Sequence, residues 1–384
     1  MEDYGRFFSD DVPAFMPSPT RELFKKVDIS KIYSLAGGFP SPDTFPTAEM
    51  ARIVSEVMET YGAKAMQYGG TQGVPELVEE ICRRTGETPQ CIQVTTSSQQ
   101  GIDVCGRVFL NPGEVVLTES PTYLGAIQSF RDYRASFRTL DEFRADPGSC
   151  GKVKFAYVIP DFGNPSGATM TLEQRQELVD LARRGDFLIV EDSPYRALRY
   201  EGTDVPTIRS LAPERTVHLC SFSKIFAPAF RLGWMEAPEE IIQKVYICKQ
   251  ALDLCPPVFD QYLAYNWMSS GRLDANLAKA KALYSSKRDI LLDELDKEMP
   301  SGATWTHPQG GLFIFVTLPE GCDTLAMYDQ AISSGIAYVP GSFFFTDGSH
   351  RNTMRLNFSY IDSDKIGPAV KLLAAFVRKM MGND

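Results

Sequence analysis

Short, continuously apolar runs of strand length recur between about residues 90 and 255, and amphipathic stretches separate them. A run without a polar face is typical of a strand that is buried on both sides, as in a parallel sheet covered by helices. The expected strands are CIQVTTS (91–97), EVVLTES (114–120), KFAYVIP (154–160), FLIVEDS (187–193), TVHLCSF (216–222) and RLGWMEA (231–237). The pattern predicts an α/β fold with a mostly parallel central sheet sandwiched by helices.

The clearest of the intervening helices is expected over residues 172–184. Thr171 and Gln174 have the spacing of a capping box, in which the two side chains satisfy each other's free backbone N–H groups. Gly185 then suits the C-terminal cap, because glycine adopts the left-handed conformation without a steric penalty. The helix is therefore predicted to begin and end at these residues.

A different pattern begins after about residue 256 and predicts a smaller α+β domain. Its expected elements are a long helix over 273–299, strands over 310–319 and 353–360, and a final helix over 364–381. The first 45 residues are proline-rich and show little periodicity, so we expect an extended arm there. The predicted division is an N-terminal arm that joins the small domain (1–45), a large domain (46–272) and a small C-terminal domain (273–384).

The charge balance of the chain indicates which partners to expect. Its 39 Lys and Arg against 49 Asp and Glu give a net charge of −10, which disfavours nucleic acid and anionic membranes and favours small molecules. No apolar run approaches the roughly 18 residues of a membrane helix. The acidic N-terminus lacks the pattern of a secretory signal, so we expect a cytoplasmic protein.

Cysteine and histidine usage argues against a disulfide scaffold and against a metal site. The eight cysteines are scattered without a CxxC pair, and none of the three histidines has a metal-ligand spacing. The motifs of serine hydrolases, P-loop proteins and dinucleotide-binding folds are also missing from the sequence. We therefore expect no metal, and the chemistry must come from other residues.

The segment SFSKIFAPAFRLGW (221–234) carries a candidate reactive lysine. Lys224 lies between two apolar runs, and a desolvated amine has a lowered pKa that makes it a nucleophile toward aldehydes. The alternative is a solvated lysine at a strand end. In the same segment, Ser221, Ser223 and Arg231 supply the two hydroxyls and the guanidinium that a phosphate dianion requires.

A second phosphate-binding segment is expected at TTSSQQG (95–101), where a strand gives way to a helix. The backbone N–H groups of Ser98 and Gln99 are free there and lie at the positive end of the helix dipole. The alternative is an ordinary helix cap, because Ser and Thr are common N-cap residues. Taken alone, this segment does not decide between the two.

Two further strand ends carry polar residues that suit an aromatic ligand. Asp192 lies at the carboxyl end of a very apolar strand, where ligands of open α/β sheets bind, and Tyr195 follows shortly after it. Asn164 lies in an Asn-Pro turn after another buried strand, although such a turn also serves simply to reverse the chain. A buried lysine, a phosphate site, an acid for a ring nitrogen, and Asn and Tyr for a ring oxygen together match pyridoxal 5′-phosphate.

These segments resemble the fold type I, class I aminotransferases of the aspartate aminotransferase superfamily, and most closely its 2-aminoadipate, kynurenine and aromatic aminotransferases. The resemblance covers almost the whole chain and includes LAGGFPSPDTFP (35–46), QYGGTQG (67–73), TTSSQQGIDV (95–104), ESPTYLGA (119–126), VPGSFFF (339–345) and MRLNFSY (354–360). It implies a large and a small domain and a pyridoxal-phosphate-dependent transaminase. That enzyme moves the amino group of an L-amino acid to a 2-oxo acid such as 2-oxoglutarate by a ping-pong mechanism.

The resemblance also implies roles for individual residues. Lys224 forms a Schiff base with the cofactor and later carries the proton between the substrate and the cofactor, Asp192 pairs with the ring nitrogen, and Tyr123 stacks on the ring. Asn164 and Tyr195 bind the ring oxygen. The residues that match the phosphate ligands are Ser98, Gln99, Ser221, Ser223 and Arg231.

The remaining implied roles concern a second subunit and the substrate. Tyr68 reaches the phosphate of the neighbouring subunit, which implies a homodimer with shared active sites. Arg355, helped by Asn164 and the backbone of Gly38, binds the substrate α-carboxylate. Arg21 meets the distal group of an acidic substrate, or else it lies on a helix surface. The donor is thus a 2-aminoadipate-like, glutamate-like, aromatic or branched-chain amino acid.

Ser97 departs from the family pattern, because relatives often have glycine there, and this bears on the phosphate contacts of Ser98 and Gln99. Two rival functions share the other features. One is another reaction of the same cofactor, such as that of a C–S β-lyase, a decarboxylase or a synthase, since the fold does not fix which bond breaks. The other is the effector-binding module of a transcription regulator, which the acidic charge disfavours.

Overall fold

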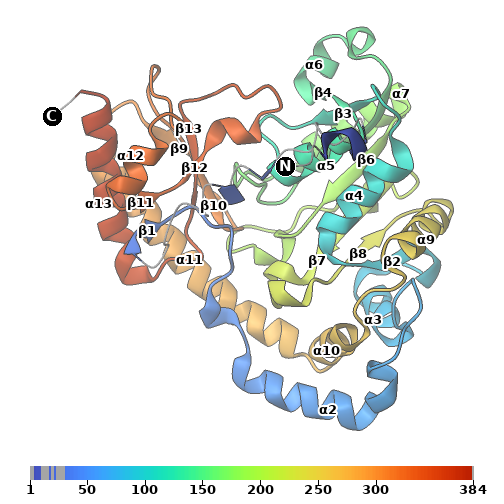
Figure 1. The fold of residues 1–384 in the computed structure, drawn as a ribbon. Coiled ribbons are helices and arrows are strands. Elements are labelled where there is room, and N and C mark those ends of the chain that lie inside the picture. Colours follow the sequence, from blue (N-terminus) through green and yellow to red (C-terminus); the bar gives the residue numbers. More distant parts are fainter. Residues whose placement is uncertain (1–3, 10–16, 19–20, 23–30, 383–384) are drawn as a thin grey trace.

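The computed structural model describes residues 4–9, 17–18, 21–22 and 31–382. A seven-stranded sheet of order β2-β8-β7-β6-β5-β3-β4 carries the large part of the fold (Figure 1). Its strands are β2 (Ile92–Thr95), β3 (Val115–Thr118), β4 (Ser136–Thr139), β5 (Val153–Val158), β6 (Leu188–Asp192), β7 (Thr216–Ser221) and β8 (Gly233–Glu236). Only β8 runs antiparallel to its neighbours, so the sheet is mostly parallel, as predicted.

The six predicted strands are all confirmed, and β4 is the strand that the prediction missed. β4 lies at the edge of the sheet, and its residues are alternately exposed and partly buried. A half-exposed edge strand lacks the continuous apolar run on which the prediction depended. The missed strand thus differs from the six predicted strands because one of its faces is exposed to solvent.

Helices cover both faces of this sheet. The first face carries α4 (Ser97–Phe109), α5 (Leu124–Asp132) and α9 (Glu239–Asp253), and the second carries α6 (Leu140–Ala145), α7 (Leu172–Gly185) and α8 (Ile208–Leu211). Successive strand residues point to opposite faces. Accordingly Val116 and Tyr157 pack in the core under α4 and α5, whereas Leu117 and Val158 pack in the core under α7.

The end of α7 corrects one detail of the prediction. The capping box of Thr171 and Gln174 is present, but Asp186, not Gly185, adopts the left-handed conformation after the helix, with φ 51°. Gly185 is the last helical residue, and a Cβ there would lie 2.8 Å from a ring carbon of Phe143. The glycine is therefore needed for packing rather than for the cap.

A second, four-stranded sheet of order β12-β13-β10-β9 lies beside the first, on the left in Figure 1. Its strands are β9 (Thr304–Trp305), β10 (Phe313–Thr317), β12 (Val339–Pro340) and β13 (Thr353–Asn357). The long helix α11 (Arg272–Glu298) packs against the final helix α13 (Ser363–Met380), and α12 (Tyr328–Ser333) precedes β11 (Ile336–Ala337). The four predicted elements of this region are confirmed.

The end of the N-terminal segment joins this smaller layer. β1 (Tyr33–Ser34) pairs in parallel with β11, and the backbone N–H of Leu35 donates to the carbonyl of Ala337 at 2.9 Å. Twenty of the 45 residues of the predicted extended arm lie outside the described residues. The domain boundaries after residues 45 and 272 stay predictions.

A third group of helices, α2 (Thr47–Ala65), α3 (Pro75–Thr85) and α10 (Val258–Ser269), packs together at one end of the molecule, the lower end in Figure 1. Their apolar side chains form a separate core against β2. Helix α10 also contacts α11, which links this group to the smaller layer. No helix within the described ranges combines the length and hydrophobicity that a membrane span requires.

Candidate active site

Lys224 lies in the short 3-10 helix η8 (Phe222–Lys224), directly after the central strand β7. Its partly buried Nζ donates a hydrogen bond to the carbonyl oxygen of Gly38 at 2.8 Å. Burial, and after it the positive charges of Arg355 and Arg231, lower the pKa of this amine to about 8. The side chain thus loses its proton at a lower pH than an exposed lysine does.

Asp192 ends strand β6 on the face that carries α4 and α5, and it is 2% exposed. Tyr157 donates its hydroxyl proton to Oδ2 at 2.7 Å, whereas Oδ1 is buried without a hydrogen-bond partner among the described residues. Burial raises the pKa of the carboxyl to about 7, against the hydrogen bond from Tyr157 and the charge of His218. An unpaired buried carboxylate oxygen is the acceptor that a protonated ring nitrogen requires, so the site fits pyridoxal phosphate.

Asn164 lies in a turn with a cis peptide bond to Pro165, and its Oδ1 accepts a hydrogen bond from Nη1 of Arg355 at 2.9 Å. Tyr195 is buried beside it. Burial raises the pKa of the Tyr195 hydroxyl, and a hydrogen bond with Asn164 acts in the opposite direction. Its ring packs edge-on against Phe313, with centroids 5.6 Å apart. The structure thus brings the two predicted ring-oxygen ligands together beside Arg355, the predicted ligand of the substrate carboxylate.

Arg355 lies in β13 of the small sheet and is 6% exposed. Besides Asn164, its Nη2 donates to the carbonyl oxygen of Ala36 at 2.7 Å, and its guanidinium lies 4.3 Å from the ring centre of Phe313. Burial lowers its pKa to about 10, and Nε has no partner among the described residues. A Cβ on Gly38 would lie only 3.1 Å from a ring carbon of Phe313. The absence of a side chain at Gly38 therefore lets the backbone approach the Phe313 ring closely.

The two predicted phosphate-binding segments lie next to each other. Helix α4 begins at Ser97, whose φ is 65°, and Nη2 of Arg231 donates to the hydroxyl of Ser97. A Cβ on Gly233 would lie 3.0 Å from the backbone nitrogen of Ser98, so the two segments are in contact. Nη1 of Arg231 is 3.5 Å from the hydroxyl of Ser223. This arrangement of a helix start, hydroxyls and a guanidinium fits a phosphate.

The hydroxyls of Ser221 and Tyr123 are fixed by neighbouring groups. Ser221 Oγ accepts the backbone N–H of Ser223 at 3.1 Å. Tyr123, which precedes α5, donates its hydroxyl proton to Oε1 of Gln99 at 3.2 Å, and Nε2 of Gln99 donates to the carbonyl oxygen of Gly125 at 3.3 Å. Tyr123 and Gln99 are therefore held together at the start of α4.

Arg21 and Tyr68 are both exposed residues. Arg21 is exposed, and its positive charge acts on the phenol of Tyr123, whose pKa burial raises. Tyr68 is 79% exposed and lines a surface hollow of about 310 Å³ between α2, α3 and α10. Arg21 is therefore near the predicted ring-stacking residue, while Tyr68 is open to a second molecule.

Sequence reasoning missed two residues that contact the site. Tyr157 fixes Asp192, and the only signal is its place in the strand next to β6, on the same face as Asp192. Phe313 packs against both Arg355 and Tyr195, and nothing in its apolar strand distinguishes it from a core residue. The contact of Tyr157 depends on the pairing of β5 with β6, and that of Phe313 on the packing of the small sheet against the segment after β6.

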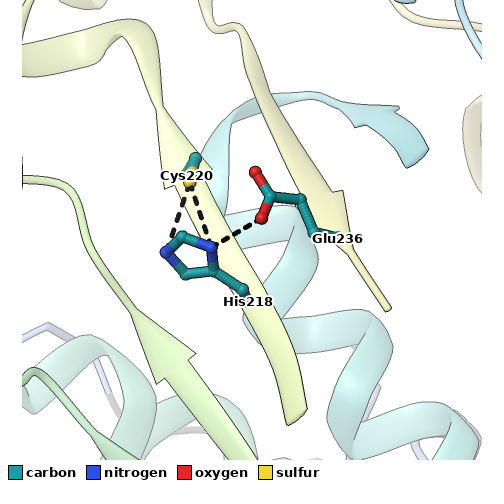
Figure 2. Close-up of side chains that lie close together, drawn as sticks. All are labelled: His218, Cys220 and Glu236. Atoms are coloured by element: carbon teal, nitrogen blue, oxygen red, sulfur yellow. Dashed lines mark hydrogen bonds and ion pairs between the residues drawn. The ribbon is translucent and has the colours of Figure 1, made fainter. Parts of the chain in front are cut away.

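A separate group of three potential metal ligands, His218, Cys220 and Glu236, is buried on strands β7 and β8 (Figure 2). Their ligand atoms lie within 4.8 Å of one another. His218 Nδ1 and Glu236 Oε2 already pair at 2.9 Å, and the sulfur of Cys220 is 3.5 Å from the other ring nitrogen. Trp234 donates to the second oxygen of Glu236 at 2.8 Å. We therefore interpret the group as a buried ion pair between neighbouring strands.

Comparison with known proteins identifies the family of the chain. The chain matches the family of class I and II aminotransferases over residues 35–373. It is 42% identical to aromatic-amino-acid aminotransferase 1 of Thermococcus litoralis, over 99% of this chain and 96% of that protein.

Two solved structures have the same fold over nearly the whole chain. Kynurenine aminotransferase of Pyrococcus horikoshii, in complex with PMP, superposes with a TM-score of 0.94 at 42% identity and covers 99% of this chain and 98% of that one. α-Aminoadipate aminotransferase of Thermus thermophilus, complexed with N-(5′-phosphopyridoxyl)-L-leucine, gives a TM-score of 0.93 at 31% identity, with coverage of 99% and 100%. The chain belongs to the class I and II aminotransferases and is a pyridoxal-phosphate-dependent transaminase.

Proposed function

We propose that this transaminase takes the amino group from aromatic L-amino acids and from 2-aminoadipate and passes it to a 2-oxo acid such as 2-oxoglutarate. Relatives named for aromatic amino acids, kynurenine and α-aminoadipate support this range. Phe313 and Phe344, whose ring centres lie 4.3 and 5.2 Å from the guanidinium of Arg355, provide apolar contact area. The exposed cation Arg21 supplies a partner for a distal carboxylate.

The observation that carries the proposal is the position of Arg355 relative to Lys224. The amine of Lys224 donates a hydrogen bond to the carbonyl oxygen of Gly38, and the guanidinium of Arg355 donates one to the carbonyl oxygen of Ala36. The amine and the guanidinium therefore both contact the same short stretch of backbone. A substrate whose α-carboxylate pairs with Arg355 thus has its amino group and Cα near the lysine. Bidentate pairing also fixes the orientation of the substrate.

Pyridoxal phosphate, when bound, supplies an aldehyde that exchanges amines and a protonated ring that accepts the electron pair released at the substrate Cα. The chain's own residues prepare the place for that ring. Asp192, oriented by Tyr157, keeps a negative charge at the ring nitrogen, and Asn164 and Tyr195 hold the ring oxygen. Tyr123 would stack on the ring, and Lys224 would remove and return the proton at the substrate Cα.

The proposed phosphate ligands are Ser98, Gln99, Ser221, Ser223 and Arg231, and Tyr68 of a second copy completes the set. An aromatic side chain that is 79% exposed beside a hollow is a candidate for contact with a partner. The test is the cofactor concentration that activity requires in mixed dimers of Tyr68→Ala and Lys224→Ala subunits. Shared sites predict that the active site of the mixed dimer binds the cofactor about as tightly as the wild type, whereas Tyr68→Ala alone binds it about tenfold more weakly and Lys224→Ala alone is inactive. A mixed dimer whose active site binds the cofactor no more tightly than Tyr68→Ala alone would contradict the shared site.

The substrate range is tested with the purified enzyme and a panel of L-amino acids in single half-reactions. The proposal predicts that aromatic amino acids and 2-aminoadipate each give one equivalent of the corresponding 2-oxo acid. Release of free ammonia in its place would indicate a lyase. An Arg21→Ala variant should raise KM for 2-aminoadipate and leave KM for phenylalanine unchanged. The cytoplasmic location stays a prediction from the sequence.

A further inference from the structure

Ser97 has an unusual backbone conformation for a residue other than glycine. Its φ is 65°, in the left-handed region, and it is 2% exposed at the first position of α4. Such a conformation is unfavourable for a side chain with a Cβ and persists only where the surroundings enforce it. Thr95 donates its hydroxyl proton to the carbonyl of Ser97 at 3.0 Å, and a Cβ on Gly233 would lie 2.9 Å from that carbonyl carbon. Packing therefore fixes the backbone at position 97.

The hydroxyl of Ser97 makes the closest contact of the Arg231 guanidinium. Nη2 of Arg231 donates to Ser97 Oγ, whereas Nη1 lies 3.5 Å from Ser223 Oγ and 3.4 Å from the carbonyl oxygen of Pro228. Arg231 itself is exposed, and none of the described carboxylates pairs with it. A guanidinium without an anionic partner, held by one short contact, is oriented mainly by that contact.

We infer that Ser97 is a positioning residue for the cofactor phosphate, whose hydroxyl aims the guanidinium of Arg231 at the phosphate oxygens. A glycine at position 97 would relieve the backbone strain but leave Nη2 without its acceptor. The serine thus destabilises the backbone locally, and its hydroxyl holds the guanidinium of Arg231 in one orientation. This inference rests on the proposed phosphate site, because it needs Arg231 to bind the phosphate.

Two substitutions at this position separate the hydroxyl from the backbone. Ser97→Ala removes the hydroxyl and keeps the strained φ, whereas Ser97→Gly removes both. The apoenzyme of each variant is titrated with pyridoxal 5′-phosphate and with pyridoxal, which lacks the phosphate. The ratio of the two affinities isolates the phosphate contact. A residue with a merely structural role would weaken both aldehydes equally and leave this ratio unchanged.

Both variants are expected to lower the ratio about tenfold, the effect of one hydrogen bond to a charged group, while the affinity for pyridoxal stays as in the wild type. The apoenzyme of Ser97→Gly should melt at a higher temperature than that of Ser97→Ala. Ser129→Ala is the matched control, because Ser129 is a buried serine that bonds to Asp103 away from the site. It should leave the ratio unchanged.

Arg231→Gln distinguishes failure of this inference from failure of the phosphate site. If Arg231→Gln leaves the ratio unchanged, the proposed phosphate site is wrong. If Arg231→Gln lowers the ratio and neither Ser97 variant does, the inference about Ser97 is overturned. A loss in Ser97→Ala that is absent in Ser97→Gly would also overturn it, because backbone strain and not the hydroxyl would then explain the effect.

Discussion

The guanidinium of Arg355 donates from Nη1 to Oδ1 of Asn164 at 2.9 Å, across the boundary between the small sheet and the large one. Both side chains are 6% exposed. A second bond, from Nη2 to Ala36 at 2.7 Å, fixes the plane of the guanidinium. The cation is therefore oriented within the chain itself, and in its proposed role as the substrate ligand this lowers the entropy that binding must remove.

Arg355→Lys should raise KM for every amino-acid substrate by about a hundredfold, because an ammonium group cannot make two parallel hydrogen bonds to a carboxylate. The change in KM should be similar for phenylalanine and for 2-aminoadipate, since both carry the same α-carboxylate. Steady-state kinetics measures it, and a thermal melt confirms that the variant is folded. An unchanged KM would remove Arg355 from the site.

Asp192→Asn should stabilise the apoenzyme and weaken cofactor binding. Burial raises the pKa of Asp192 to about 7, above its value of about 3.9 in an unfolded chain. The folded state thus binds more protons between these values, and its stability falls as the pH rises through this window. Asparagine does not ionise, so the variant loses no stability as the pH rises. At neutral pH the free energy of unfolding of the variant apoenzyme should therefore exceed that of the wild type by on the order of a few kcal/mol. Near pH 4 the two should differ little.

Denaturant unfolding of both apoenzymes across this pH range makes the measurement. Tyr157→Phe is the matched control, because it removes the hydrogen bond that lowers the pKa of Asp192. Its loss of stability with rising pH should extend to a higher pH than in the wild type. A variant Asp192→Asn that is less stable than the wild type at neutral pH would show that the carboxylate is not a destabilising group.

The large sheet and the identity of the lysine could be predicted from the sequence because both depend on local composition. The buried strands are apolar throughout, and Lys224 is an isolated cation between two apolar runs. The contact of Arg355 with Asn164 depends on how two sheets pack, and no local pattern records it. The left-handed backbone of Ser97 lies against Gly233, which is distant in the sequence, so no local pattern records it either.

Glu236→Gln should destabilise the fold by about 3 kcal/mol near neutral pH, because it leaves a buried imidazolium without its partner. Burial lowers the pKa of His218, but the neighbouring Cys220, Glu236 and Glu191 outweigh it and hold the pKa well above its usual value. The charged pair of His218 and Glu236 therefore stabilises the fold fully below pH 6.5, which is about the pKa of histidine in the unfolded chain. This stabilisation is lost as the pH rises through the raised pKa of His218 in the folded chain.

The measurement is the pH dependence of the difference in the free energy of unfolding between the wild type and Glu236→Gln. Unfolding of the wild type and of Glu236→Gln is compared from neutral to alkaline pH, and the two stabilities should converge as His218 loses its proton. A difference that stays constant over this range would mean that His218 is neutral in the folded protein.

Cofactor uptake by the apoenzyme should accelerate as the pH rises through about 8, because the pKa of Lys224 is lowered to that value and only the neutral amine attacks an aldehyde. The positive charge of Arg355 contributes to the lowering. Arg355→Gln should therefore move the midpoint to a higher pH. Stopped-flow absorbance at a series of pH values measures it, and a midpoint near the ordinary lysine value in the wild type would contradict the buried amine.

The central claim is that Lys224 carries the cofactor covalently. Reduction of the holoenzyme with borohydride fixes the cofactor to its lysine, and peptide mass spectrometry then identifies that residue. The account predicts the phosphopyridoxyl group on Lys224, and none on this peptide in the Lys224→Ala variant. Attachment to another lysine, or an equal yield of labelled protein from Lys224→Ala, would contradict it.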